Sequence, residues 1–382
     1  MSANNEAAGD GRAAVKALIR RMEREAPELA LFLVYDRPSR AGERPGLERA
    51  FFTQRCVSDE QLRQTVEAFR SIGAYVELFE GEREFIGAAA SGRLGSLQRR
   101  MKVVYNGIEG SIAHDAFMPG RKALVPAVAD SYGFLCANSN AYACALGRHK
   151  FHYLSLLSSL GLPTPRTWHY RKETGWAGGH SPTEGLKVIA KSTYESWSVG
   201  VTDESIFLAD STSTNRVAAI AERIGQSVTV QEFVAGQEVC VPVLATPELM
   251  GTPPVVAVLA KAPLDPEAVM TIDDNLMSGG VTYQALTDQD LVGRLHSLAL
   301  RAFIALELDA FARIDFRVDE SGNPFIFDVG VSPGLSRGSS AFASMSHWGF
   351  THEEFLRAIL AASLPASGIR TPSGVSPELH LR

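Results

Sequence analysis

The sequence lacks several features that mark common classes of protein. It has four cysteines in 382 residues and none in a CxxC spacing, so neither a zinc site nor a disulfide framework is indicated. Its formal net charge of −6 gives no electrostatic reason to expect binding to nucleic acid or to an anionic membrane. We also find no internal repeat. These absences favour reduced thiols and partners other than nucleic acid.

Long hydrophobic runs are missing as well. No uninterrupted apolar segment is long enough to span a bilayer, and the opening residues, MSANNEAAGDG, are polar. We therefore expect a cytoplasmic protein with no membrane partner. Hydrophobic residues make up 45% and charged residues 21%, which is an ordinary balance for a soluble globular protein. The length exceeds that of one ordinary core and predicts two or three domains.

The first part of the chain has the rhythm of a parallel α/β unit. Leu29 to Tyr35 is a short, continuous apolar run, as expected for a strand buried on both faces. A helix start at Ser58 and an end near Gly73 follow, and then come predicted strands at 74–79 and 101–106. Strands alternating with helices predict a parallel sheet covered by helices.

The third predicted strand ends in two polar residues. Asn106 and Glu109 follow it directly, and ligands of open α/β sheets bind beyond the carboxyl ends of strands. Both are therefore candidate substrate contacts. An ordinary exit from a strand into a loop explains them equally well.

The middle of the chain places two lysines in suggestive positions. A helix is predicted over 138–160, and it contains the basic run Arg148-His149-Lys150, which would otherwise be a solvated turn. Lys191 ends a predicted strand and precedes a loop rich in small polar residues. Loop amides and a lysine can together cradle a phosphate, although this loop is not a Walker A sequence.

A hairpin at 311–329 is the clearest pattern in the sequence. Apolar and charged residues alternate strictly in its first strand, a turn with Gly, Asn and Pro follows, and a second strand begins at Phe325. In-register pairing would bring Arg313, Asp315 and Asp328 onto one polar face. Such a face suits Mg²⁺ carrying phosphate oxygens. An exposed face with salt-bridging charges is the alternative.

The remaining elements are predicted from shorter signals. Residues 262–282 are loop-like and long enough to suggest a lid over a site. The other predicted strands and helices are strands at 227–232, 238–245 and 255–261 and helices at 291–308 and 353–362.

The order of these elements resembles the ATP-grasp superfamily and, within it, the D-alanine–D-alanine ligase branch, most strongly from Val104 to Ser340. Family proteins bind ATP between two α+β lobes, convert a carboxylate into an acylphosphate and let an amine attack it. The resemblance implies an α/β plus α+β fold, in which an N-terminal parallel α/β domain precedes two α+β lobes enclosing ATP. It also implies an ADP-forming carboxylate–amine ligase that uses ATP with Mg²⁺, or with Mn²⁺.

The phosphate-binding positions of the family have counterparts here. Lys150 stands the same distance before Gly-Leu-Pro as the family's first nucleotide lysine. Lys191, followed by Glu195 and Ser198, resembles the family's Lys-Pro-x-x-Glu-Gly-Ser-Ser-Val-Gly loop, with Trp197 in place of the first serine. The resemblance gives Lys191 a catalytic role as well.

The adenosine-binding positions are matched by one strand. The run from Gln231 to Glu238 looks like the family's hinge strand, which takes the adenine and ribose. Gln231 stands where the family usually has an adenine-reading Glu, and Glu238 matches the ribose carboxylate. Glu232 and Val234 fall within the same nucleotide-binding run.

The hairpin corresponds to the family's metal and substrate segment. Arg313 and Asp315 match its Arg-x-Asp pair, which serves a phosphate and a metal respectively. Asp328 begins a run similar to Glu-x-Asn-x-x-Pro-Gly, and this makes it the second metal ligand. In that run Gly334 is a substrate position, and Ser339 falls on the family's substrate-binding serine. The resemblance thus makes Arg313 and Ser339 both catalytic and substrate-binding.

Several departures concern the substrate pocket and the second metal. Asp328 is one methylene shorter than the usual Glu, and Gly330 stands where an Asn would bind the second metal. Glu109, a predicted substrate contact, replaces a His, and the family's N-terminal Gly-Gly-x-Ser-x-Glu loop is missing. We therefore expect substrates other than D-alanine.

Three alternatives stay open at this point: a catalytically impaired nucleotide-binding protein, an ATP-grasp kinase or carboxylase, and D-alanine–D-alanine ligase proper. The predicted domains are 1–137 (α/β), 138–234 (central lobe) and 235–366 (C-terminal lobe), followed by a tail at 367–382. The expected partners are a small-molecule carboxylate and amine, and the family's frequent dimerisation makes a homodimer an expectation.

Overall fold

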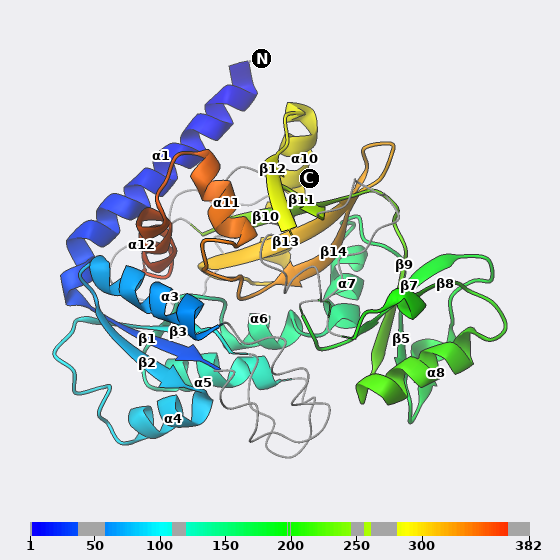
Figure 1. Ribbon diagram of the computed structural model, residues 1–382, viewed down its shortest axis with the longest axis horizontal. Coiled ribbons are helices and arrows are strands. Elements are labelled where there is room, and N and C mark those ends of the chain that lie inside the picture. Colours follow the sequence, from blue (N-terminus) through cyan, green and yellow to red (C-terminus); the bar gives the residue numbers. More distant parts are fainter. Residues whose placement is uncertain are drawn as a thin grey trace.

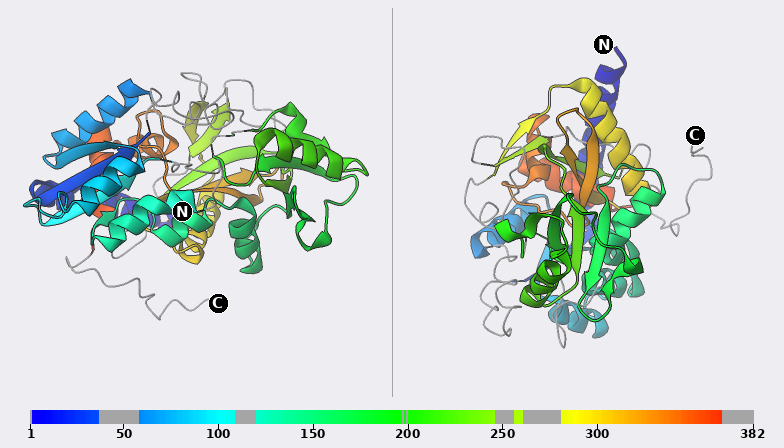
Figure 2. Two further views of the ribbon diagram at one scale, coloured as in Figure 1. Left: turned by 90° about the horizontal axis from the view of Figure 1, so that it is seen from below. Right: turned by 90° about the vertical axis from the view of Figure 1, so that its right-hand side faces the viewer.

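The computed structural model describes residues 2–36, 58–108, 120–196, 198, 200–245, 256–260 and 281–365. Within these ranges the strands form three sheets, ordered β2-β1-β3-β4, β6-β5-β9-β7-β8 and β12-β11-β10-β13-β14. The last of these lies between the other two, as Figure 1 and the turned views of Figure 2 show. None of the helices in the described part of the chain is long and apolar enough to cross a membrane.

The parallel sheet is buried on both faces, as its sequence predicts. It consists of β1 (Leu29–Tyr35), β2 (Tyr75–Glu80), β3 (Met101–Asn106) and β4 (Leu135–Cys136), all paired in parallel. Every residue of β1 is buried. Its alternate residues join two separate hydrophobic cores, because helices cover both sides of the sheet.

Each face of this sheet is covered by its own set of helices. One core contains residues of α1 (Ser2–Glu25), α3 (Asp59–Ser71) and α12 (His352–Ala362), whereas the other contains residues of α4 (Glu82–Ala90) and α5 (Leu124–Ser131). Helix α3 begins with a complete capping box on Ser58, which confirms its predicted start.

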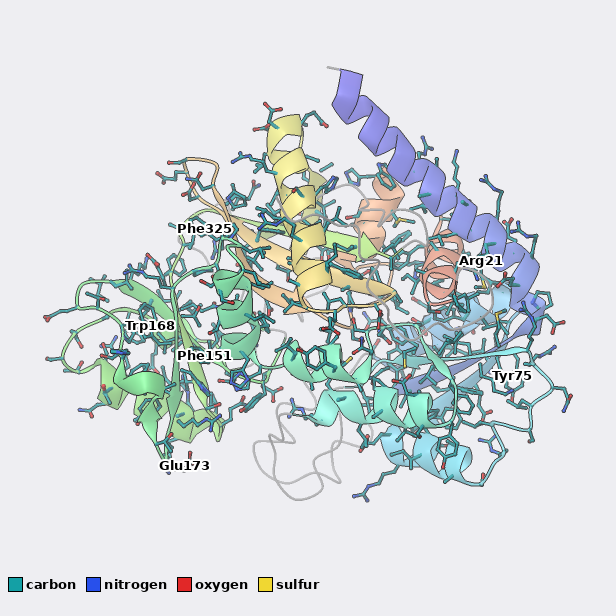
Figure 3. All side chains as sticks on the ribbon, turned by 180° about the vertical axis from the view of Figure 1, so that it is seen from behind. Arg21, Tyr75, Phe151, Trp168, Glu173 and Phe325 are labelled. Atoms are coloured by element: carbon teal, nitrogen blue, oxygen red, sulfur yellow. The ribbon has the colours of Figure 1, made fainter. Side chains whose placement is uncertain are left out.

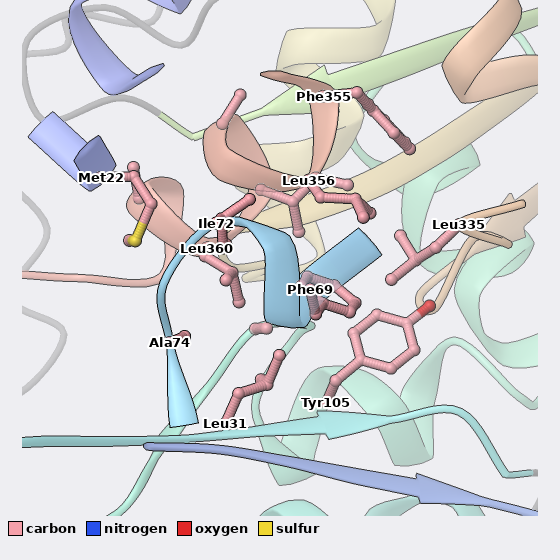
Figure 4. Packing of buried hydrophobic residues seen from close by; sticks show 14 of the residues in the cluster. Met22, Leu31, Phe69, Ile72, Ala74, Tyr105, Leu335, Phe355, Leu356 and Leu360 are labelled. Carbon is pink, nitrogen blue, oxygen red and sulfur yellow. The ribbon is translucent and has the colours of Figure 1, made fainter. Parts of the chain in front are cut away.

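The C-terminal helix packs against the N-terminal sheet. In Figure 4, Phe355, Leu356 and Leu360 lie over Phe69 and Leu31. Residues from both ends of the chain thus share one hydrophobic core, although the predicted boundaries assign 353–362 to the last lobe. Those boundaries stay a prediction.

The second sheet is smaller and antiparallel. Its strands are β5 (Thr167–Arg171), β6 (Gly175–Trp176), β7 (Lys187–Ser192), β8 (Ile206–Leu208) and β9 (Val228–Glu232). Helix α8 (Ser213–Ile224) packs on one face of this sheet through buried apolar residues such as Val217 and Ile220. Together they form a compact layer with a core of its own.

The prediction of one continuous helix over 138–160 is wrong. The structure has two helices, α6 (Ala141–Leu146) and α7 (Lys150–Ser159). Between them, Gly147 approaches the side chain of Val331 so closely that a Cβ would lie 2.2 Å from a methyl carbon of that valine. The His149 side chain then caps the new helix by accepting the backbone N–H of His152.

Helix α7 lies between the two antiparallel sheets. Phe151, which is labelled in Figure 3, lies on this helix beside the small sheet. Its ring stacks on His169 of β5 at a centroid distance of 5.2 Å. On its other side, Tyr153, Leu154 and Leu157 belong to the core of the third sheet. The helix therefore connects the two sheets through side-chain packing on both of its sides.

The third sheet contains the predicted hairpin. Its strands are β10 (Gln237–Leu244), β11 (Val256–Ala260), β12 (Val281–Ala285), β13 (Phe311–Val318) and β14 (Pro324–Gly330). Helix α10 (Gln289–Ala305) covers one face together with α7, and α11 (Ser340–His347) follows the hairpin. The predicted lid at 262–282 lies almost entirely outside the described residues.

Candidate active site

A cleft lies where the two antiparallel sheets face each other. The small sheet contributes Lys191 and the residues after it, and the larger sheet contributes charged residues of β10, β13 and β14. The charged and polar residues that line the cleft are Lys150, Lys191, Ser192, Glu195, Ser196, Ser198, Gln231, Glu232, Glu238, Tyr283, Arg313, Asp315, Arg317, Asp328 and Ser340.

The hairpin brings its two carboxylates together as predicted. Asp315 pairs directly with Asp328 across β13 and β14, and a register shift follows between Asp315 and Phe316. Arg313 donates two hydrogen bonds to Asp315, from Nε to Oδ1 at 2.7 Å and from Nη2 to Oδ2 at 2.6 Å. The convergence of these three residues is confirmed, and their chemical roles stay predictions.

The pKa values of the two carboxylates are shifted in opposite directions. Burial raises the pKa of Asp315 above its ordinary value, even though Arg313 favours the ionised form. Burial acts on Asp328 in the same direction, but there Lys150 and Lys191 outweigh it and lower the pKa. Tyr153 also donates a hydrogen bond of 2.7 Å to Oδ1 of Asp328. Asp328 is thus held in its ionised form.

This carboxylate pair fits a magnesium ion that also carries phosphate. The described residues contain no group of three or more His, Cys, Asp or Glu side chains that could hold a metal ion by themselves. Mg²⁺ commonly takes only one or two carboxylates together with substrate phosphates, so Asp315 and Asp328 suffice. Gly330 adds no ligand, and a Cβ there would be in ordinary contact with Arg313 at 3.5 Å.

The two predicted nucleotide lysines face these carboxylates. Burial lowers the pKa of Lys191 to about 8, with Asp328 opposing the shift. Its ammonium lies 4.7 Å from the ring centroid of Phe327 on β14. Lys150, the first residue of α7, is buried and donates from Nζ to the carbonyl of Glu195. Both predicted positions therefore line the cleft.

The loop after Lys191 is held by a contact that the sequence did not reveal. Glu195 is buried and accepts a hydrogen bond of 2.7 Å from Arg121, in a short 3₁₀ helix η3 (Arg121–Ala123). Ser198 also lines the cleft, and its φ of 57° is a strained backbone conformation for a residue other than glycine. Trp197 lies outside the described residues.

Residues of the predicted adenosine-binding run also line the cleft. Gln231 is buried and donates from Nε2 to the carbonyl of Phe327 at 3.2 Å. Glu238 pairs with Arg317 at 3.3 Å, yet burial raises its pKa. Glu232 and Val234 lie on the same wall, and Glu232 is also paired with a surface arginine.

The predicted substrate positions are only partly on the cleft. Ser340 rather than Ser339 lines it, and its Oγ accepts a hydrogen bond of 3.4 Å from Arg313. Ser339 instead caps α11 by accepting the N–H of Phe342 at 3.2 Å. Gly334 is exposed, and Glu109 lies outside the described residues.

Asn106 forms hydrogen bonds within the protein interior. It is buried, and its amide donates to the carbonyl of Lys122 at 3.0 Å, whereas its backbone N–H donates to Asn138 at 2.7 Å. The bond from its side-chain amide gives Asn106 a structural role, which favours the alternative of an ordinary strand exit, and its substrate contact stays a prediction.

Sequence reasoning missed further residues of the site. Cys240 of β10 stands opposite Asp315, and Tyr283 of β12 lines the same end of the cleft. Burial raises the pKa of Tyr283 to about 12, so the phenol stays protonated. The even spacing of Glu238 and Cys240 along one strand could have indicated a shared face, whereas Tyr283 follows a loop and gives no such signal.

More than half of the chain matches the model of one family of known proteins. Residues 156–361 match the family model described as "D-ala D-ala ligase C-terminus". A D-alanine–D-alanine ligase of Polaromonas naphthalenivorans is 24% identical over 312 residues, which cover 78% of this chain and 87% of the relative. D-alanine–D-alanine ligase B of Pseudomonas putida is 25% identical over 257 residues, or 65% of this chain and 74% of the relative.

The fold is also similar to that of solved structures. A D-alanine–D-alanine ligase from Bacillus anthracis, in complex with ATP, superposes with a TM-score of 0.62 at 14% sequence identity. The match covers 87% of this chain and 97% of that chain. This similarity confirms the predicted fold, with a parallel sheet followed by two antiparallel sheets.

Proposed function

Since the chain belongs to the ATP-grasp family that contains the D-alanine–D-alanine ligase C-terminal domain, we propose that it joins a carboxylate to an amine through an acylphosphate. It is an ATP-dependent, ADP-forming ligase of this family. The carboxylate, the amine and the intermediate are our proposal, supported by the chemistry of the cleft.

The observation that carries the proposal is the placement of two lysines opposite two carboxylates across the cleft. Lys150 and Lys191 face Asp315 and Asp328, and all four side chains line one cavity. A triphosphate needs cations around its oxygens, and its metal needs carboxylates on the far side. The cleft offers both the cations and the carboxylates in one place.

The chain's own residues can then perform two steps. In the first, a substrate carboxylate attacks the γ-phosphoryl group of ATP, the bond to the β-phosphate oxygen breaks, and ADP and an acylphosphate form. Lys150, Lys191 and Arg313 would offset the charge on the transferring group. In the second step an amine attacks the acyl carbon, phosphate leaves, and the amide loses a proton.

Divalent metal would act from the opposite wall. Asp315 and Asp328 are the residues that would hold Mg²⁺, or Mn²⁺, and the bound ion would neutralise charge on the phosphates. Tyr153 orients Asp328 through its hydrogen bond, and Arg313 orients Asp315. Both carboxylates therefore have fixed positions before any ligand enters.

D-alanine as both substrates is a second candidate, and the names of the relatives favour it. Against it we set the sequence departures at Glu109 and Gly330, which replace family residues in the substrate and metal segments. A catalytically impaired nucleotide-binding protein is distinguished by experiment, because it would bind ATP without any substrate-dependent hydrolysis.

The test is ADP release from Mg·ATP with a panel of single amino acids, other carboxylic acids and pairs, D-alanine included, followed by mass spectrometry. Substrate-dependent ADP together with a new amide mass would support the ligase and identify its substrates. If ATP bound tightly while ADP release stayed at background with the whole panel, the catalytically impaired protein would be favoured.

A further inference from the structure

One ion pair connects the N-terminal part of the chain to the nucleotide cleft. The Arg121 guanidinium donates to Glu195 Oε1 at 2.7 Å, and the two side chains are 2% and 0% exposed. Arg121 lies in η3, between β3 and α5, whereas Glu195 follows β7 of the small sheet. The pair therefore joins two separate layers of the fold.

Glu195 is a junction of several contacts at the cleft. Its carbonyl accepts a hydrogen bond from Lys150 Nζ, and its carboxylate also accepts one from Gln226 Nε2 at 3.4 Å. Gln226 in turn accepts the backbone N–H of Tyr194 at 3.0 Å. The position of Glu195 thus determines where Lys150 and the start of the loop are held.

We propose that Arg121 is a positioning residue for the nucleotide. By fixing the carboxylate of Glu195, it keeps the Glu195 carbonyl on Lys150 and keeps Ser196 and Ser198 on the cleft wall. This role rests on the proposed function, because it assumes that ATP phosphates bind between this wall and the carboxylate hairpin. No assignment made from the sequence includes Arg121.

The effect of the Arg121–Glu195 pair on stability can be distinguished from its effect on the position of Glu195. Two charges taken out of water lose much of their hydration, so a buried ion pair adds little net stability compared with uncharged residues of similar size. Removing only one partner is strongly destabilising, because the other charge is left buried and uncompensated. The charge-assisted hydrogen bond from the guanidinium, however, holds Glu195 Oε1 in one place, and neutral residues of similar size do not reproduce it.

The experiment compares Arg121→Met with the double variant Arg121→Met/Glu195→Gln. The single variant leaves a buried carboxylate without its cation, and we expect a lower Tm together with weaker ATP binding. The double variant removes both charges, and we expect its Tm to return close to that of the wild type. Its ATP affinity, measured by calorimetry, should still be about tenfold weaker or worse.

Control measurements make the outcome decisive. Arg223→Met removes an exposed ion pair on the same layer, with Glu204, and should leave ATP affinity unchanged. If the double variant regained both Tm and full ATP affinity, Arg121 would have only a structural role and the proposal would be overturned. If the wild-type protein itself did not bind ATP, the proposed function would fail, and the role of Arg121 with it.

Discussion

Within the described residues the two antiparallel sheets have the same number of strands, but they bring different charged groups to the cleft. Each has five strands and a face covered by helices. The small sheet presents Lys191, with Lys150 beside it, whereas the large sheet presents Asp315, Asp328 and Glu238. The large sheet also contributes Arg313 and Arg317, and Glu195 follows β7 of the small sheet, so both signs of charge occur on each side. The proposed site for a metal-bound triphosphate would combine the two lysines of one side with the carboxylates of the other.

On each side of the cleft, burial disfavours the charged form of a site residue. Burial lowers the pKa of Lys191 on one side and raises the pKa of Asp315 on the other, so burial disfavours the charged form on both sides. The opposing charges counteract this effect, since the lysines lower the pKa of Asp328. Lys191 and Asp328, on different sheets, thus stabilise each other's charges, and the proposed function would place a nucleotide and its metal between them.

The largest effect is expected from removing a charge on the carboxylate side. Asp315→Asn should lower turnover with Mg·ATP about a thousandfold, because a metal ligand is lost, and it should also lower the Tm, because Arg313 loses the buried carboxylate that it pairs with. Steady-state ADP release and circular dichroism check the two halves of this expectation. Asp319→Asn, in the exposed turn of the same hairpin, is the matched control, and near-normal turnover of Asp315→Asn would show that the metal assignment is wrong.

Removing a charge on the lysine side should mainly affect nucleotide binding. Lys191→Ala is expected to weaken ATP binding by about 10- to 100-fold, because a charge-assisted contact to phosphate is lost. Calorimetric titration measures this change. Lys172→Ala removes an exposed lysine of the same layer and should have no effect. Unchanged affinity in Lys191→Ala would contradict the phosphate-loop assignment.

The two sides should also differ in their response to pH. The pKa of Lys191 is lowered to about 8, so its ammonium is protonated below that pH and neutral above it. ATP affinity should therefore be full below pH 8 and should fall as the pH rises through 8, and binding near that pH should take up a proton. Titrations in buffers of different ionisation enthalpy detect the uptake. The same uptake in Lys191→Ala would assign it to another group.

The smallest effect is expected where an uncharged group supports a charged one. Tyr153→Phe removes the hydrogen bond to Asp328 and should cost about 1 kcal/mol of stability, with a loss of turnover of only about fivefold. Denaturant unfolding and ADP release measure both quantities. A loss of turnover as large as that of Asp315→Asn would mean that Tyr153 has a direct role in the reaction.

The parts of this account that the sequence could predict are those with local signals. The hairpin at 311–329 follows from strict alternation and turn residues, and its pairing then fixes Asp315 opposite Asp328. The buried strand at Leu29–Tyr35 follows from its continuous apolar run. The nucleotide positions needed more than local pattern, because they depend on similarity to a family.

The missed features depend on contacts between distant parts of the chain. The break at Gly147 is set by its approach to Val331, which lies far along the sequence. Arg121 and Glu195 are joined only by the tertiary fold. Ser340 replaces Ser339 on the cleft because Ser339 caps a helix that the sequence did not indicate. Each of these requires the arrangement of the layers to be known first.

The most direct test of the opposed charges is ATP binding to Asp328→Asn, measured by calorimetry with and without Mg²⁺. If Asp328 holds the metal, the variant should lose most of the affinity that Mg²⁺ adds. Without metal it should bind ATP at least as well as the wild type, because a negative charge near the phosphates is gone. If Mg²⁺ strengthened ATP binding equally in the variant and the wild type, the carboxylate hairpin would not be the metal side of the cleft.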